Sequence, residues 1–229
     1  MTRHQQRDES LEWVLPLEVS GPIDFTLIGI WAMNHRSSTP LEPSAPRQPL
    51  AAADTYNFDK LRGRVVVAGD FNSNPNWDST RHPRFARLVE RYRQDGLTSA
   101  YHHGSDEAHG AETKPTLWWR NRIKDGPKFH VDYIFLPDSW LSASAVEIGG
   151  YDEWVSTAGS DHAPIIVDIN IEHLRHVERT SVGQEGTEQA AQNDADDDGP
   201  RRARSAHPRF WHSRARSACP LWSSARPVA

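Results

Sequence analysis

The sequence Gly69-Asp70-Phe71-Asn72 places a carboxylate and an amide two residues apart, directly after the apolar run Val65–Ala68. Polar groups that follow a buried strand lie at the rim of a sheet, where the sites of α/β proteins are usually built. In an extended backbone Asp70 and Asn72 would project from the same face. The carboxylate can ligate a hard cation or accept a proton, and the amide can donate to a phosphate oxygen. A plain Asp/Asn turn that ends the strand explains the pattern equally well.

A second polar group, Ser160-Asp161-His162, precedes the apolar run Ile165–Ile171. A carboxylate beside an imidazole suits metal binding and proton transfer near neutral pH. A solvent-exposed loop with incidental polar residues would have the same sequence, so this pair is weak evidence when it is taken alone.

A third group contains Asp132, which interrupts the apolar run Val131–Leu136. A buried carboxylate is costly without a partner, and we expect His162 to be that partner, as a base is often oriented by a third group. The alternative is that Asp132 faces solvent from an edge strand. We expect His130 on the strand surface rather than as a ligand.

The elements that must position these groups are predicted from apolar patterns. Strands at Val14–Val19 and Phe25–Trp31 form a hairpin through Gly21-Pro22; Pro16 favours an edge position, and the dense Phe25–Trp31 run favours burial on both faces. Further strands are predicted at Val65–Ala68, Trp118-Trp119, Val131–Leu136, Ala145–Ile148 and Ile165–Ile171.

Two helices are predicted between the strands. Ala51–Leu61 reads as a short helix after the Pro-rich loop Ser37–Gln48. A second helix carries an apolar stripe at positions i, i+3, i+4 and i+7, followed by Gly96 as its terminator; the stripe is Phe85, Leu88, Val89 and Tyr92. Alternating strands and helices indicate an α/β or α+β fold.

Composition bounds the class of protein. The chain has 229 residues and a net charge of −5, so no global basic field attracts it to nucleic acid. Its single cysteine, Cys219, excludes an internal disulfide framework and a thiolate zinc cluster. No run approaches the ~20 apolar residues of a membrane span, and the N-terminus lacks an apolar signal core. We therefore expect a cytoplasmic protein.

Three regions differ in composition. Met1–Ser10 is polar and is predicted to be flexible, Leu11–Glu172 carries the folded domain, and His173–Ala229 is predicted to be disordered. This last region is acidic first and Arg-rich after Pro200. The Arg-rich end could contact nucleic acid, although a solvated tail without function is the simpler interpretation.

Taken together and in order, the Gly-Asp-Phe-Asn, Val-Asp-Tyr-Ile and Ser-Asp-His motifs resemble those of the endonuclease/exonuclease/phosphatase superfamily, with its DNase I-like and exonuclease III-like members. The resemblance covers roughly Glu12–Ile171. It implies an α/β (α+β) four-layered sandwich of two packed sheets. It also implies hydrolysis of phosphodiester or phosphomonoester bonds with Mg²⁺ or Mn²⁺, and a nucleic acid or another phosphodiester as substrate.

The resemblance also implies a role for each residue. Asp70 would position or deprotonate the attacking water, and Asn72 would hold a phosphate oxygen. Asp161 would help to bind the metal. His162 would contact the scissile phosphate, as general base or as electrostatic stabiliser, and Asp132 would orient it. These roles agree with the needs of phosphoryl chemistry, which are a cation and a positioned nucleophile.

Aromatic residues near these motifs are candidates for substrate binding. Trp31 occupies the position at which the family has a functional His or Tyr, and Asn34 is the candidate for the Asn that follows. Trp cannot accept a proton or ligate a metal, so stacking would replace that contact. Trp118 and Trp119 could line the substrate groove, with core packing as the alternative.

The family's first strand-helix-strand unit, with a catalytic Asn and a metal-binding Glu, has no counterpart before Val14. We therefore expect an incomplete, N-terminally truncated DNase I-like fold. Three functions follow as hypotheses: a nuclease-like metal-dependent hydrolase, which we favour; a catalytically impaired remnant; and a non-catalytic nucleic-acid-binding protein that uses the Arg-rich tail. The sequence does not predict the oligomeric state.

Overall fold

The computed structural model describes residues 2–3, 7–32, 47–61, 64–78, 84–120 and 122–176. The chain divides into a unit of residues Met1–Glu185 and a unit of residues Gly186–Ala229, and every described residue belongs to the first. Asn34, residues 37–46 of the predicted loop and the predicted tail beyond residue 176 lie outside the described residues.

The largest sheet has six strands and is mixed. Its order is β1 (Thr2–Arg3), β2 (Val14–Val19), β3 (Phe25–Trp31), β4 (Val65–Asp70), β8 (Asp132–Pro137) and β5 (Leu97–Ser99). The predicted β2–β3 hairpin is confirmed, β3 runs parallel to β4, and β8 runs antiparallel to β4 and to β5. The expected edge position of β2 is wrong, because β1 pairs with its residues Leu17 and Glu18 and β2 lies between β1 and β3.

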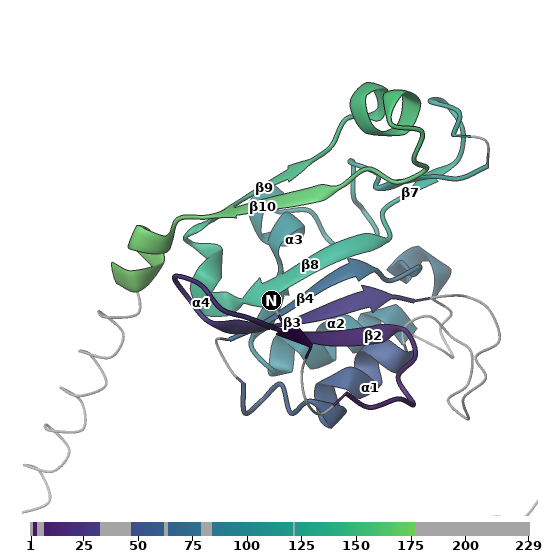
Figure 1. The fold of residues 1–229 in the computed structure, drawn as a ribbon. Helices are drawn as coiled ribbons and strands as arrows, with labels where there is room; N and C mark the ends of the chain where they lie inside the picture. Colours follow the sequence, from purple (N-terminus) through teal and green to yellow (C-terminus); the bar gives the residue numbers. More distant parts are fainter. Residues whose placement is uncertain are drawn as a thin grey trace, which may run out of the picture. The chain divides into compact units, whose positions relative to one another are not determined.

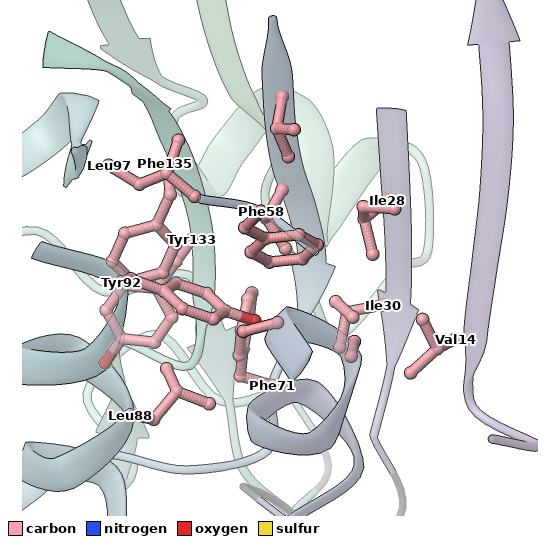
Figure 2. Close-up of a cluster of buried hydrophobic side chains, with 14 of the residues drawn as sticks. Val14, Ile28, Ile30, Phe58, Phe71, Leu88, Tyr92, Leu97, Tyr133 and Phe135 are labelled. Atoms are coloured by element: carbon pink, nitrogen blue, oxygen red, sulfur yellow. The ribbon is translucent and has the colours of Figure 1, made fainter. Parts of the chain in front are cut away.

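Helices α1 (Arg47–Thr55) and α2 (Arg84–Gln94) cover one face of this sheet (Figure 1). The predicted α2 is confirmed, and its apolar stripe packs with the sheet around Phe71, Tyr133 and Phe135 (Figure 2). The predicted helix Ala51–Leu61 is misplaced, because α1 begins at Arg47 and ends at Thr55. Pro49 lies in its first turn, where a missing N–H costs no intrahelical hydrogen bond.

The opposite face of the sheet meets a smaller antiparallel pair, β9 (Ser144–Ile148) and β10 (Ile165–Ile169) (Figure 1). Helices α3 (Ala100–Ser105) and α4 (Asp138–Leu141) pack with it in a second apolar cluster. This cluster includes Leu174, which is fully buried in the helical residues 171–176. The core therefore extends at least to Leu174. The main sheet thus has helices α1 and α2 packed on one face and β9, β10, α3 and α4 on the other, which is the predicted α/β layering.

Short elements frame the end of the sheet at which the motifs lie. They are the 3₁₀-helix η1 (Pro75–Trp77), the antiparallel strands β6 (Leu117–Trp118) and β7 (Lys128–Phe129), and the π-helical segment η2 (Tyr151–Thr157). A third apolar cluster joins Trp118, Val155 and Ala163 in this region. Among the described residues, no helix combines the length and apolar character needed to cross a bilayer.

β3 was expected to be buried on both faces, but it is fully buried on only one of them. Thr26, Ile28 and Ile30 are buried toward α1 and α2, whereas Phe25 and Leu27 are half-buried on the other face. Trp31, at the carboxyl end of the strand, is 64% exposed. The strand therefore ends with a large aromatic side chain in contact with solvent.

Candidate active site

Three of the predicted site residues form a row across the main sheet. Trp31 of β3 is paired in register with Asp70 of β4, and Asp70 is paired with Asp132 of β8. Val66 on β4 and Leu136 on β8 belong to the second cluster. Because side chains alternate along a strand, Asp70 and Asp132 face the same side as these residues. The strand pattern thus sets two carboxylates side by side at the edge of one face.

The loop after Asp70 is a tight turn, as the Asp/Asn-turn alternative describes, and not extended backbone. Asn72 has a left-handed φ of 44°. Its backbone N–H donates to Asp70 Oδ1 at 2.8 Å, and its amide nitrogen donates to Asp70 Oδ2 and to the Ala32 carbonyl, each at 2.7 Å. Asp70 and Asn72 are brought together by these hydrogen bonds, as in an Asx turn. The amide also ties β4 to the end of β3.

Gly69 and Phe71 explain why the motif folds in this way. Gly69 has φ 139°, and a Cβ there would stand 1.9 Å from the Ile30 carbonyl oxygen, so no larger residue fits. Phe71 is fully buried, and its ring makes edge contacts with Phe85, Tyr133 and Phe135 at centroid distances of 5.6–6.4 Å. Figure 2 shows Phe71 within this aromatic cluster. The glycine and the phenylalanine thus fix the backbone on both sides of Asp70, and Asn72 follows directly.

The predicted pairing of His162 with Asp132 is confirmed. His162 Nδ1 lies 2.8 Å from Asp132 Oδ2, and the two side chains are 31% and 19% exposed. The loop is pinned by its backbone, because Trp118 N–H donates to the Asp161 carbonyl at 2.8 Å and His162 bridges to Leu117. His162 N–H also donates to Ser160 Oγ at 3.0 Å. The imidazole is therefore held on a fixed loop beside the row of carboxylates.

The pKa values of Asp70 and of His162 are both raised, but by different causes. Burial, followed by repulsion from Asp132, raises the pKa of Asp70 from 3.8 to about 6. The hydrogen bond to Asp132 raises the pKa of His162 above its usual 6.5, although burial opposes it. Near pH 7, Asp70 is therefore an ionised carboxylate with unusual basicity, and His162 is biased toward the imidazolium.

An open pocket of about 590 Å³ lies beside these groups. Asp132, His162 and Ser160 provide polar atoms on its wall. The rest of the wall comes from β4, β8, η2 and β10, and it consists of Ala68, Gly69, Tyr133, Ile134, Trp154, Ala158, Ala163, Pro164 and Ile165. Apolar surroundings of this kind strengthen electrostatic contacts to a bound anion.

A second pocket, of about 520 Å³, adjoins Asp161 and is lined by Trp118, Trp119, Arg120 and Arg122. The ring of Trp118 is buried against Tyr151 at a centroid distance of 5.5 Å, so the core-packing alternative describes it. Trp119 is 49% exposed. The aromatic side chain available for stacking in this pocket is that of Trp119, which corrects the emphasis on Trp118.

The donor types at the site fit a hard divalent cation. Asp70, Asp132 and Asp161 act on one another electrostatically, and both neighbours raise the pKa of Asp70, so a cation would relieve their repulsion. Asp132 is already committed to His162. Among the described residues, these three carboxylates do not form a group with all ligand atoms within 4.8 Å. Asp70 and the exposed Asp161 are the donors left for a cation.

Sequence reasoning missed one residue of the motif region and misjudged another. Asn74 is buried, and its amide nitrogen donates to the His130 carbonyl at 3.1 Å and to Glu112 Oε2 at 3.2 Å. His130 is 3% exposed and not on the strand surface as expected, and it lies near Lys114. Asn74, the first Asn after Gly-Asp-Phe-Asn, was the available signal, because a buried amide must be hydrogen-bonded.

The fold and the site define an α/β protein with acid, base and imidazole groups at the ends of neighbouring strands. The profile of the Endonuclease/Exonuclease/phosphatase family matches residues 2–162, and the chain belongs to this family. The superfamily and fold class predicted from the motifs are thereby confirmed. No curated protein sequence is significantly similar to the chain.

Similar solved structures include the 3'-5' exonuclease NExo from Neisseria meningitidis, at 20% identity over 69% of this chain and 64% of that chain, with a TM-score of 0.49. They also include truncated Caenorhabditis elegans TDP2 (20% identity, 67% and 58%, TM-score 0.44) and an AP endonuclease from Archaeoglobus fulgidus (12%, 69% and 65%, TM-score 0.46). The chain spans less than two thirds of the length of each of these structures.

Proposed function

We propose that the chain is a metal-dependent hydrolase of phosphodiester bonds that acts on nucleic acid. The observation that carries this proposal is the His162–Asp132 hydrogen bond of 2.8 Å beside Asp70, whose pKa is raised to about 6. Hydrolysis of a phosphodiester needs a base for water and positive charge against the phosphate. These residues can supply both, on rigid strand ends and at the rim of a pocket.

In this proposal Asp70 accepts the proton of the attacking water. A carboxylate with a pKa near 6 is largely ionised at pH 7 and is a stronger base than an ordinary aspartate. His162 acts as the imidazolium: Nδ1 is held by Asp132, and Nε2 is the ring nitrogen that can donate to a phosphate oxygen. The raised pKa of His162 favours electrostatic stabilisation over the general-base alternative.

Asp161 is the residue that would help to hold the proposed Mg²⁺ or Mn²⁺, which would supply positive charge against the phosphate. Asn72 is the proposed phosphate ligand. Its amide nitrogen already donates to Asp70 and to Ala32, so it must give up one of these bonds to reach a phosphate. Asn34 also stays a proposed substrate contact.

Nucleic acid is the proposed substrate because exposed aromatic rings flank the site. Trp31 lies next to Asp70 in register, and Trp119 shares its pocket with Arg120 and Arg122. Indole rings can stack on bases, at about 1–3 kcal/mol per base, and guanidinium groups can contact phosphates.

The cytoplasmic location stays a prediction.

The test compares cleavage of plasmid DNA and of bis-p-nitrophenyl phosphate by the whole chain with Mg²⁺, with Mn²⁺ and with a chelator. His162→Ala should lower the rate by a factor of about 10² or more, because it removes the group that is proposed to stabilise the phosphate charge. His173→Ala is the matched control, since His173 is an exposed imidazole outside the site.

Equal and metal-independent rates for the wild type and for His162→Ala would sink the hydrolase proposal. DNA binding without cleavage would then support the impaired-remnant hypothesis. If that binding is salt-dependent and is lost when the residues after Pro200 are deleted, the Arg-rich tail is the binding element.

A further inference from the structure

A cluster of histidines lies on the face of β8 opposite to Asp132. His102 of α3 and His109 of the following loop stack with ring centroids 3.5 Å apart, and His109 also packs over Phe85 and Phe135. Glu112 approaches His102, with Glu112 Oε1 3.2 Å from His102 Nε2. The side chains of His102 and Glu112 are 7% and 3% exposed. Two imidazoles and a carboxylate thus meet in a protected place that the proposed hydrolysis does not use.

The spacing of these groups fits a tetrahedral cation. One ligand atom from each of His102, His109 and Glu112 lies within 4.8 Å of the other two. Zn–N and Zn–O bonds of about 2.0–2.2 Å require ligand atoms about 3.4 Å apart in a tetrahedron. The 3.2 Å separation of His102 Nε2 and Glu112 Oε1 is already close to that edge. The ligand atom of His109 lies within 4.8 Å of both, so His109 would have to move toward them to complete this geometry.

Two of the three ligands, His109 and Glu112, have the protonation states that a metal needs. Burial, followed by repulsion from His102, lowers the pKa of His109 to about 3, so its imidazole is neutral at physiological pH. Burial opposes ionisation of Glu112, but hydrogen bonds from His102 and from the backbone prevail and lower its pKa to about 2. His109 and Glu112 thus have no proton to displace, whereas His102 Nε2 would give up the proton that it donates to Glu112 when a metal binds there.

The surroundings orient the ligands as in known metal sites. His102 Nδ1 lies 2.8 Å from Ser99 Oγ, and this hydroxyl can accept a hydrogen bond from Nδ1–H while Nε2 binds a metal. Glu112 is fixed by Gly110 N–H at 2.9 Å and by the amide of Asn74 at 3.2 Å. Among the described residues, the buried His109 Nδ1 has no hydrogen-bond partner. A buried nitrogen of this kind is costly unless something binds it.

We propose that His102, His109 and Glu112 form a structural site for a zinc-like divalent cation, separate from the proposed hydrolase centre. Two imidazoles and one carboxylate suit Zn²⁺ better than Mg²⁺, which prefers oxygen ligands. The cation would tie the loop between α3 and β6 to α3 itself. Asn74 donates hydrogen bonds to Glu112 and to the His130 carbonyl, so the cation would also stabilise the loop after β4.

The experiment uses the whole chain, stripped with a chelator, and measures binding of Zn²⁺ and of Co²⁺ by calorimetry and by visible absorption. Thermal unfolding is recorded with and without Zn²⁺. His109→Phe keeps a flat ring in the stack but removes the ligand, and Glu112→Gln keeps the shape but removes the charge. His103→Gln is the matched control, because His103 is an exposed residue on the same helix.

The wild type and His103→Gln should bind one equivalent of Zn²⁺ more than either ligand variant. At a free Zn²⁺ concentration of a hundred times Kd, their unfolding midpoints should rise by about 5–10 °C, and those of the ligand variants should not. Mg²⁺ should give no such rise that depends on His109. Equal stoichiometry and equal midpoint shifts in all four proteins would overturn the proposal, and would assign any bound zinc to other residues. If His109→Phe does not fold, Glu112→Gln decides alone. None of these readouts depends on hydrolysis.

Discussion

Replacing Asp70 by Asn should stabilise the protein at neutral pH while it removes the proposed base. The pKa of Asp70 rises from 3.8 to about 6, chiefly through burial, and this difference corresponds to about 3 kcal/mol against the ionised form. Asn is neutral and avoids that cost. Its NH₂ group cannot accept the hydrogen bond from the Asn72 amide, which costs about 1 kcal/mol. The net gain expected near pH 7.5 is therefore about 2 kcal/mol.

The pH dependence of the free energy of unfolding distinguishes the ionisation of Asp70 from other causes of a stability gain. Because the folded-state pKa of Asp70 lies above its unfolded value, the wild type loses stability as the pH rises from about 4 through about 6. The Asn variant has no such titration. Its advantage should therefore be absent at about pH 3, grow across this window and become constant above about pH 7.

The assay is urea unfolding in a chelator, followed by tryptophan fluorescence at several pH values between about 3 and 8. Asp168→Asn on β10 is the matched control, because Asp168 is an exposed strand carboxylate and its replacement should change the free energy of unfolding by about 0.5 kcal/mol at most. A gain that is constant across the pH range, or a loss of stability near pH 7.5, would refute the assignment of the raised pKa to burial of Asp70.

Three further substitutions test other contacts. Asp132→Asn should lower the pKa of His162, measured by NMR titration of the imidazole, and an unchanged pKa would contradict the role of their hydrogen bond. Phe71→Ala should cost about 3–5 kcal/mol of unfolding free energy in urea, since it empties the centre of the aromatic cluster, and a cost below about 1 kcal/mol would show that the ring is not an anchor. Gly69→Ala should cost more than about 2 kcal/mol in the same assay, because its Cβ would meet the Ile30 carbonyl oxygen, and near-wild-type stability would contradict that clash.

The sequence predicted strands well where apolar residues alternate or cluster. The bounds predicted for β2 and β3 agree with the structure, and β4 and β8 differ by one or two residues at their ends. The strand pairing was less accessible, because alternation determines which face a side chain occupies and not which neighbour it meets. That Asp70 lies between Trp31 and Asp132 follows from register alone.

The errors have local and non-local causes. The predicted loop ran to Gln48, yet α1 begins at Arg47, and Pro49 is compatible with the first turn of this helix. For Asn72 the sequence left an extended backbone and a turn open, and the turn is present because Asn is one of the residues that adopt the left-handed conformation. The cluster of His102, His109 and Glu112 comes from a polar stretch without periodicity, and its burial depends on contacts with Phe85 and Tyr133, far away in the sequence.

The pairing of Asp70 with Asp132 limits where the chain can tolerate insertions and deletions. Insertion or loss of one residue within β8 would bring Tyr133 to the face of Asp132 and send the carboxylate into the aromatic cluster. The shift would bury a carboxylate without a partner among aromatic rings and would turn Tyr133 and Phe135 out of the core, so the fold would be lost together with the proposed chemistry. Natural insertions and deletions should therefore accumulate in the stretches between strands, and the length of β8 should not change among homologues.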